Sequence, residues 1–206
     1  MAGERTEIQK ELKKELEKER YEHTLGVMYT AGCLAMRYGC DMDQAMMAGL
    51  LHDCAKCIPN DKKLKLCKKY DITLTQTELD NPFLIHAKLG AFLAAEKYHV
   101  TDPEICHAIK VHTTGAPDMN LLDKIIFIAD YMEPNRNKAP NLASIRALAF
   151  EDLDRALIQI LEDTLGYLAK GDKRDSIDPM TRKTYEYYTE RNHYESDIKG
   201  NGEAGI

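Results

Sequence analysis

Apolar residues recur along this chain three and four positions apart, which is the spacing of one face of an α-helix, and the strict alternation typical of β-strands is almost absent. Clusters containing Pro, Gly, Asn or Asp separate the apolar segments. The pattern therefore predicts an all-α protein. The helices that we expect cover residues 7–19, 20–38, 42–53, 60–70, 82–98, 103–112, 121–132 and 142–169, with a polar segment after Gly171.

The helix expected at 42–53 is apolar nearly all round, which predicts a central position in the core. Asp41 or Asp43 is suited to cap its start. Residues 7–19 instead interleave Lys and Glu, so we interpret this helix as a solvated lead-in to the fold. A partner-binding role for it is the less favoured alternative.

The chain has 206 residues and no Pro/Gly/Ser-rich linker, which predicts one domain with a sizeable core. We expect a charged N-terminal helix at 1–19 packed on a main domain at 20–190, and a polar tail at 191–206. Hydrophobic content of 44% with 30% charged residues is ordinary for a soluble globular protein. The net charge of -6, without a basic stripe bearing aromatic residues, argues against a nucleic acid as partner.

The sequence predicts neither a leader nor a membrane span. Residues 1–20 are almost wholly polar, and no later segment approaches the roughly 20 apolar residues of a span, so we expect a cytoplasmic protein with no membrane partner. The six cysteines are then most simply reduced core residues. Cys54 and Cys57 form a C-x-x-C pair, but the helical setting and the lack of a second pair disfavour a redox or zinc site. A homodimer is compatible with the sequence.

Several polar side chains fall on apolar helix faces. Asp130 continues the line of Leu122 and Ile126 at four-residue spacing, and an unpaired carboxylate on such a face requires a cation. His86 and His112 also lie on the apolar lines of their helices. Taken alone, each histidine is more simply a hydrogen-bonded core or surface residue.

Taken together, these side chains form an ordered set spread over five expected helices. Metal centres inside helical bundles are built from such inward-projecting side chains on facing helices, so the set predicts a metal site in the core. His99, His107 and His193 lie at a helix end, off the apolar line and in the polar tail, and we exclude them. The set consists of His23, His52, Asp53, His86, His112 and Asp130.

The order of these residues resembles the HD superfamily of metal-dependent phosphohydrolases, whose hallmark is a dispersed His, a His-Asp doublet and a downstream Asp. A closer resemblance is to the YqeK-type branch, the symmetrical bis(5'-nucleosyl)-tetraphosphatases. It implies an HD-type helical bundle with the metal site in its core, and an HD phosphohydrolase domain over 20–190. In the last matching segment the family usually has His where this chain has Asp178. The segments that carry the resemblance are RYEHT (20–24), HDCAK (52–56), HAKLGA (86–91), HTTG (112–115), IADYMEPNR (128–136) and, more weakly, IDPMT (177–181).

Imidazole and carboxylate ligands without thiolate favour iron, manganese or another first-row ion over a structural zinc. The resemblance favours iron, with manganese, cobalt or magnesium as alternatives. Asp53 has two oxygens and can bridge to a second ion reached by His86 and His112; with one ion only, these two histidines are free to contact phosphate. The side chains expected to hold the first, tightly bound ion are His23, His52, Asp53 and Asp130.

We assign catalysis to Asp53 and Lys56. Lys56 follows Asp53 by three positions, which on a continuing helix places its ammonium beside the ligands and suits it to a phosphate oxygen; a solvated surface lysine is the alternative. Arg136 can make a planar two-bond contact to phosphate. Arg20 either does likewise or orients a ligand. Thr113 is a candidate hydroxyl donor to the substrate, or a plain turn residue.

The resemblance implies an enzyme that hydrolyses diadenosine tetraphosphate at its central phosphoanhydride to two ADP. A broader nucleotide phosphohydrolase or phosphodiesterase of the HD superfamily is the first alternative. The second is a non-catalytic nucleotide sensor that keeps its metal as a structural element, although such a protein would be expected to lose Lys56 or a ligand. In each case the expected partner is a small-molecule nucleotide.

Overall fold

The computed structural model describes residues 2–170 and 177–202, and within them it contains helices and no β-strand. The expected all-α class is confirmed. No helix in this described part is long and apolar enough to cross a membrane. The helices are α1 (Ala2–Glu15), α2 (Lys18–Tyr38), α3 (Met42–Leu51), α4 (Asn60–Lys69), α5 (Gln76–Asp80), the 3-10 helix η1 (Pro82–Ile85), α6 (His86–Glu96), α7 (Pro103–Val111), α8 (Leu121–Met132), α9 (Leu142–Glu151), α10 (Leu153–Leu168) and α11 (Pro179–Gly202).

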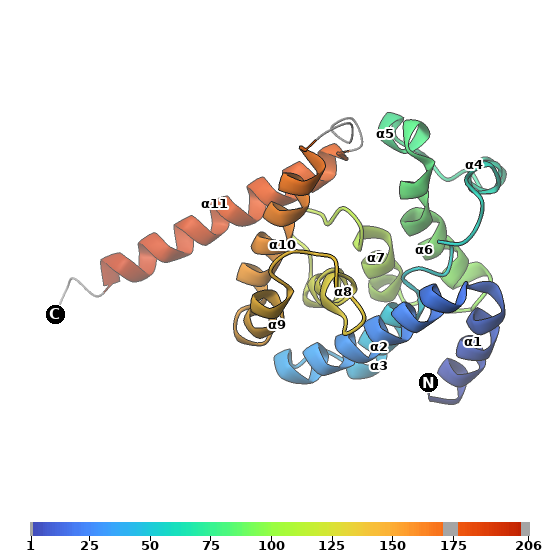
Figure 1. The fold of residues 1–206 in the computed structure, drawn as a ribbon, viewed down its shortest axis with the longest axis horizontal. Helices are drawn as coiled ribbons and strands as arrows, with labels where there is room; N and C mark the ends of the chain where they lie inside the picture. The colour runs from blue at the N-terminus through green and yellow to red at the C-terminus, as the bar shows by residue number, and fades with distance from the viewer. Residues whose placement is uncertain (1, 171–176, 203–206) are drawn as a thin grey trace.

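Helix α8 lies at the centre of the molecule (Figure 1). It contacts the pair α2 and α3 on one side, α7 on another, and α9 and α10 on a third. Its residues Ile125, Ile126 and Ile128 are fully buried. Because so many elements meet at α8, a polar side chain on its inner face reaches the interior of the bundle.

Helices α2 and α3 form the most extensive helix pair of the fold. Gly39 ends α2 in the left-handed conformation (φ 73°), and Asp41, one of the two expected caps, accepts a hydrogen bond from Gln44 N at 2.9 Å. Near the end of α3, a Cβ at Gly49 would lie 2.9 Å from Met28 Cα. The missing side chain at Gly49 therefore lets the end of α3 approach α2 closely.

The N-terminal helix differs from the one expected at 7–19. Helix α1 spans Ala2–Glu15 and buries Ile8 and Leu12, with Leu16 buried just after its end. Its charged residues cover the opposite face, so it is an amphipathic helix packed on α2 and α3 and not a solvated one. The division at residues 19 and 190 stays a prediction.

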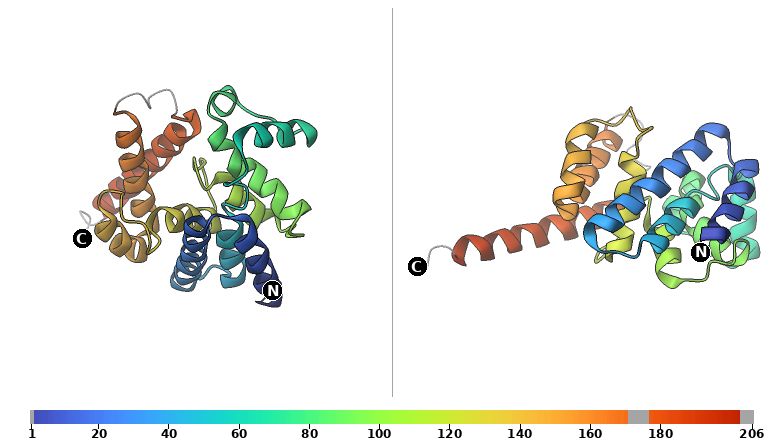
Figure 2. Two further views of the ribbon diagram at one scale, coloured as in Figure 1. Left: turned by 45° about the vertical axis from the view of Figure 1, so that its right-hand side comes forward. Right: turned by 90° about the horizontal axis from the view of Figure 1, so that it is seen from below.

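One further expectation is wrong. The single helix expected at 142–169 is two helices, because the side chain of Asp152 accepts a hydrogen bond from Arg155 N at 3.0 Å and caps a new helix, α10. The polar segment after Gly171 contains a helix that the sequence did not predict, α11, which packs on α10 and buries Tyr188. The right-hand view of Figure 2 shows the far end of α11 projecting beyond the body.

Candidate metal centre

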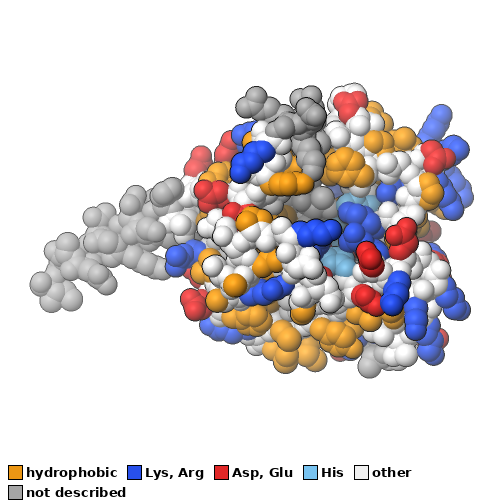
Figure 3. All heavy atoms as spheres, viewed as in Figure 1, with side chains coloured by type: hydrophobic (Ala, Val, Ile, Leu, Met, Phe, Trp, Pro, Cys, Tyr) orange, Lys and Arg blue, Asp and Glu red, His pale blue; other side chains and the backbone are white. Residues whose placement is uncertain are grey.

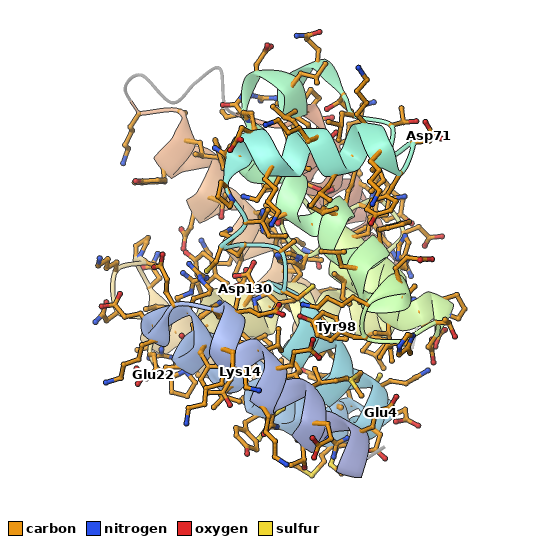
Figure 4. The ribbon with its side chains drawn as sticks, turned by 90° about the vertical axis from the view of Figure 1, so that its right-hand side faces the viewer. Glu4, Lys14, Glu22, Asp71, Tyr98 and Asp130 are labelled. Carbon is orange, nitrogen blue, oxygen red and sulfur yellow. The ribbon has the colours of Figure 1, made fainter. Side chains whose placement is uncertain are left out.

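The fold brings the six predicted ligand side chains together at the meeting point of five helices. His23 lies in α2 and Asp130 in α8, whereas the other four stand at helix ends. His52 and Asp53 follow α3, His86 begins α6, and His112 follows α7. Figure 4 shows Asp130 on the inner side of α2, while Glu22 of α2 points away to the outside.

One part of this cluster consists of His23, His52 and Asp130, whose ligand atoms lie within 4.8 Å of one another. His23 Nε2 is 3.0 Å from Asp130 Oδ1, and His52 Nε2 is 3.8 Å from the same oxygen. Asp53 Oδ2 lies 3.9 Å from His23 Nε2 and 3.5 Å from His52 Nε2. Two imidazoles and two carboxylates therefore face one point.

The other oxygen of Asp53 faces the remaining histidines. Oδ1 lies 3.3 Å from His86 Nε2 and 3.6 Å from His112 Nε2. His52, Asp53 and His112 also have ligand atoms within 4.8 Å of one another. Asp53 thus stands between the two parts of the cluster, with one oxygen directed to each.

Hydrogen bonds at Nδ1 direct the Nε2 atom of each histidine to the centre. The Nδ1 atoms of His52, His86 and His112 lie 2.7, 2.6 and 2.7 Å from the backbone oxygens of Gly49, Phe83 and Ile109, which are acceptors only. His23 Nδ1 faces a carboxylate oxygen of Glu133 at 3.1 Å. In the neutral imidazole each Nδ1 therefore donates, and each Nε2 then offers a lone pair to the centre.

These atoms fit a metal ion. His23 Nε2, His52 Nε2 and Asp53 Oδ1 are buried and make no hydrogen bond with any residue that the structure describes. Buried polar atoms are rarely left without a partner, and lone pairs on neutral imidazole together with carboxylate oxygens are the donors that first-row divalent metals bind. The donor set suits a divalent metal.

The electrostatics keep both acids ionised. Burial opposes ionisation of Asp53, but His52, His112 and His86 outweigh it and hold the pKa of Asp53 well below its usual value. Burial likewise opposes ionisation of Asp130, yet its pKa is held well below the usual value by His23, His52 and Arg136. Both carboxylates are therefore ready to bind a cation at neutral pH.

The pKa values of His52 and His86 are shifted in opposite directions. Burial lowers the pKa of His52, but the carboxylates of Asp53 and Asp130 outweigh burial and raise it above the ordinary value. Burial, with the Lys56 ammonium, lowers the pKa of His86 to about 4 against the opposing effect of Asp53. A metal therefore competes with a proton at His52, whereas His86 is neutral.

Lys56 and Thr113 contact the outer histidines. Lys56 Nζ lies 3.1 Å from His86 Nε2 and donates to it, and it is 3.9 Å from Asp53 Oδ1. Thr113 Oγ1 lies 3.3 Å from His86 Nε2 and 3.1 Å from His112 Nε2. Both residues therefore lie beside the clustered histidines, and their roles stay a prediction.

The two predicted arginines each contact a carboxylate of the cluster. Arg20 Nη1 donates to Asp53 Oδ2 at 2.8 Å, and Arg136 Nη2 donates to Asp130 Oδ1 at 2.6 Å. Both guanidinium groups are partly exposed. In Figure 3 histidine atoms are visible among Lys and Arg side chains near the middle of the face. The cluster is therefore open to an anionic ligand from the basic side.

A cavity of about 220 Å³ adjoins the cluster at Thr113. Thr113, Thr114, Lys88 and Lys110 line it, together with Asp178 and Met180 from the segment before and at the start of α11. Thr113 belongs to both the cavity and the cluster. The weakly matching segment at 177–181 therefore lies at the same face of the molecule as the ligands.

The excluded histidines are not part of the cluster, although His107 lines the cavity beside it. His99 is exposed, and His107 contacts the buried Asp123, with Nδ1 2.9 Å from Oδ2. The side chain of His193 is outside the described residues. The sequence interpretation missed the contact of Glu133 with His23, because Glu133 follows the end of α8 and no apolar periodicity marks it as buried.

The chain is similar to known proteins over the region that contains the cluster. The family model described as "HD domain" matches residues 20–135, a stretch that encloses all six clustered side chains. The chain is 40% identical over 176 residues to "Bis(5'-nucleosyl)-tetraphosphatase, symmetrical" of Bacillus subtilis, covering 85% of this chain and 92% of that protein. It is also 40% identical to the protein of the same name from Halalkalibacterium halodurans, covering 84% of this chain and 91% of that protein.

A solved structure is also similar. It is a crystal structure of a "predicted HD superfamily hydrolase involved in NAD metabolism" from Clostridium acetobutylicum, with a TM-score of 0.85 and 37% sequence identity. The match covers 90% of this chain and 97% of that one. The likeness therefore extends over nearly the whole fold and is not confined to the motif residues.

Proposed function

Because the chain belongs to the HD-domain family, and within it to the symmetrical bis(5'-nucleosyl)-tetraphosphatases, we propose that it hydrolyses dinucleoside tetraphosphates at the central phosphoanhydride. With diadenosine tetraphosphate, one water and one substrate molecule give two ADP. The observation that carries the proposal is the 40% identity over 92% of a protein named for this reaction. The clustered imidazoles and carboxylates support it, because phosphoanhydride hydrolysis is a typical task of such a site.

We propose that His23, His52, Asp53 and Asp130 hold one divalent ion tightly, with iron as the resident metal and manganese, cobalt or magnesium as substitutes. When bound, such an ion polarises a phosphoryl oxygen and lowers the pKa of water. The ionised state of both acids and the buried Nε2 atoms of His23 and His52, which have no hydrogen-bond partner among the described residues, support this ligand set. Asp53 Oδ1 is available to a second ion shared with His86 and His112.

The remaining polar side chains are proposed to bind the polyphosphate. Lys56, Arg20 and Arg136 present cationic donors around the ligands, and each now contacts a group that a phosphate oxygen can replace as acceptor. Charge that develops on the transferred phosphoryl group and on the departing nucleoside diphosphate is stabilised by such fixed donors. Without a second ion, Thr113, His86 and His112 would contact the phosphate chain from the other side.

The cavity of about 220 Å³ beside Thr113 is proposed to receive one nucleoside of the substrate. Holding one half of a symmetrical molecule in the cavity, and its phosphates on the basic side chains, places the central bridge rather than a terminal one at the ligands. Asp178 lines this cavity at the position where the family usually has His. We therefore propose that Asp178 contacts the nucleoside.

We also propose that the protein acts in the cytoplasm; a homodimer is compatible with its sequence. The cysteines, Cys33, Cys40, Cys54, Cys57, Cys67 and Cys106, are free thiols, which is the usual state in a reducing compartment. The proposed substrate is an intracellular nucleotide. Size-exclusion chromatography with light scattering would test the oligomeric state.

Product analysis tests the proposed activity. Purified protein loaded with Fe²⁺, Mn²⁺ or Co²⁺ is incubated with diadenosine tetraphosphate, and nucleotides are separated by chromatography. ADP as the sole product is expected, and chelator-treated protein serves as the matched control. AMP with ATP would contradict the central cut. An absence of turnover with all three metals would favour a nucleotide sensor.

A further inference from the structure

The carboxylate of Glu133 is buried between α2 and the turn that follows α8, with only 1% of the side chain exposed. Oε1 lies 3.1 Å from His23 Nδ1 and accepts a hydrogen bond from it. Oε2 accepts a hydrogen bond from the backbone N of Asn135 at 2.8 Å. Each oxygen therefore has a different N–H donor as its partner.

This contact sets His23 apart from the other clustered histidines. His52, His86 and His112 donate to backbone oxygens three residues earlier, so their own local turns orient them. His23 depends on a residue 110 positions away. A carboxylate also makes an imidazole a stronger ligand than a backbone carbonyl does, because it stabilises positive charge on the ring.

The same carboxylate fixes the turn that carries Arg136. Glu133 Oε2 holds the backbone N of Asn135, and the next residue, Arg136, donates its backbone N to Glu133 O at 3.0 Å. From this turn the Arg136 side chain donates to both Asp130 O and Asp130 Oδ1, at 2.9 and 2.6 Å. One buried acid is thus linked to two predicted ligands, directly to His23 and through Arg136 to Asp130.

The absence of a side chain at Gly26 leaves the space that the Glu133 carboxylate occupies. A Cβ at Gly26, one turn after His23 on α2, would lie 2.2 Å from Glu133 Oε2 and 2.9 Å from its Cδ. These distances are far below van der Waals contact, so any side chain at this position displaces the carboxylate. The close approach of Glu133 to α2 depends on glycine at this position.

We propose that Glu133 is a positioning residue that fixes the tautomer and ring orientation of His23 for metal binding and holds the Arg136 turn against α2, with Gly26 providing its space. The inference rests on the proposed function only for its effect on activity. Its effect on metal affinity is independent of the substrate.

The test measures Co²⁺ affinity of metal-free protein by visible absorption, with and without Glu133→Gln. The amide keeps the shape of the side chain but turns an NH₂ group towards one of the two N–H donors, so one hydrogen bond is lost. We expect the Kd for Co²⁺ to rise about 10- to 100-fold, with a changed Co²⁺ spectrum. Glu22→Gln, the same change one residue from His23 on the exposed face of α2 (Figure 4), should leave both unchanged.

Gly26→Ala gives a second variant that retains both Glu133 and His23. It should weaken Co²⁺ binding as Glu133→Gln does, whereas Gly166→Ala, where a Cβ meets nothing within 4 Å, should not. Circular dichroism of the metal-free variants checks that the helices persist. Unchanged Co²⁺ affinity and spectrum in Glu133→Gln, or in Gly26→Ala, would overturn the inference. If the parent protein binds Co²⁺ but does not cut diadenosine tetraphosphate, the proposed function fails and the inference stands.

Discussion

At the scale of single residues, Asp53 is distinguished by having both oxygens directed at imidazole nitrogens, with the Arg20 guanidinium as the closest cation. An amide at this position keeps the volume but loses the negative charge and one of the two acceptor atoms. Losing this charge should therefore weaken metal binding while the helical fold is kept.

Asp53→Asn tests this expectation. We expect Co²⁺ affinity to fall by more than about 10²-fold and activity to be lost, because a ligand is removed from a charged first-row metal site. The helical circular dichroism spectrum should persist. Asp61→Asn, at a side chain that is 72% exposed on α4, is the matched control. Unchanged metal content in Asp53→Asn would remove Asp53 from the centre.

Lys56→Met separates substrate contact from metal binding. The ammonium group lies beside His86 and is proposed to bind a phosphate oxygen, so its loss should lower kcat/KM by about 10²-fold, the typical effect of removing one charge-stabilising donor. Steady-state kinetics with diadenosine tetraphosphate provide the measurement. The Co²⁺ affinity of Lys56→Met should stay within a factor of about three of the parent value. The matched control is Lys65→Met, because the Lys65 side chain is 79% exposed, and both its kcat/KM and its Co²⁺ affinity should stay within the same factor. An unchanged kcat/KM would contradict the role of Lys56.

Residue patterns were informative where a polar side chain interrupts an apolar helix face. Asp130 could be identified because Leu122 and Ile126 define the buried line of α8. Glu133 could not, since it lies beyond the helix end and its burial depends on the space above Gly26. Such burial arises from tertiary packing between distant segments, which a one-dimensional periodicity does not contain.

At the scale of elements, the turn between α8 and α9 is held by a residue of α9. The Arg146 side chain donates to the backbone oxygens of Met132, Glu133 and Arg136 at 2.8, 2.9 and 2.9 Å. Three acceptors on one guanidinium group fix the path of the turn. Helix α9 therefore acts on the centre without contributing a ligand to it.

Arg146→Met should loosen this turn. A hydrogen bond to a charged donor contributes about 1.5–3 kcal/mol, and 1 kcal/mol corresponds to about 2–4 °C in a domain of this size, so we expect Tm to fall by at least about 3 °C. KM for the nucleotide should rise more than kcat changes, because Arg136 loses its fixed position. Calorimetry and steady-state kinetics test both effects. Arg155→Met, at an exposed position of α10, is the control; a KM equal to that of the parent would contradict the coupling.

Sequence patterns located most helices but not all their boundaries. The expected helix at 121–132 agrees with α8, where the capping box of Asn120 and Asp123 and a regular apolar face coincide. The break at Asp152 was missed because no Pro or Gly marks it and the apolar spacing continues past it. A single Asp that caps the following helix was enough to separate α9 from α10.

At the scale of the whole molecule, the proposed first ion would connect α2 and α8 with the turn after α3. An ion that binds only the folded chain adds about 2.7 kcal/mol at a free concentration of 100 times its Kd. The Tm should therefore rise by about 5–11 °C when Co²⁺ is added to this concentration, because 1 kcal/mol corresponds to about 2–4 °C in a domain of this size. Asp53→Asn should show no such rise. An equal rise in that variant would indicate that Co²⁺ stabilises the protein elsewhere.

The span from His23 to Asp130 in the chain also governs when the centre can form during folding. The side chains of the metal centre belong to helices that are far apart in the sequence. They can meet only after the intervening helices have packed together, and closing such long loops is a late, entropically unfavourable event in folding. Interactions absent from the transition state change the unfolding rate and leave the refolding rate almost unaltered. In stopped-flow chevron plots, Co²⁺ should accordingly lower the unfolding arm and leave the refolding arm in place.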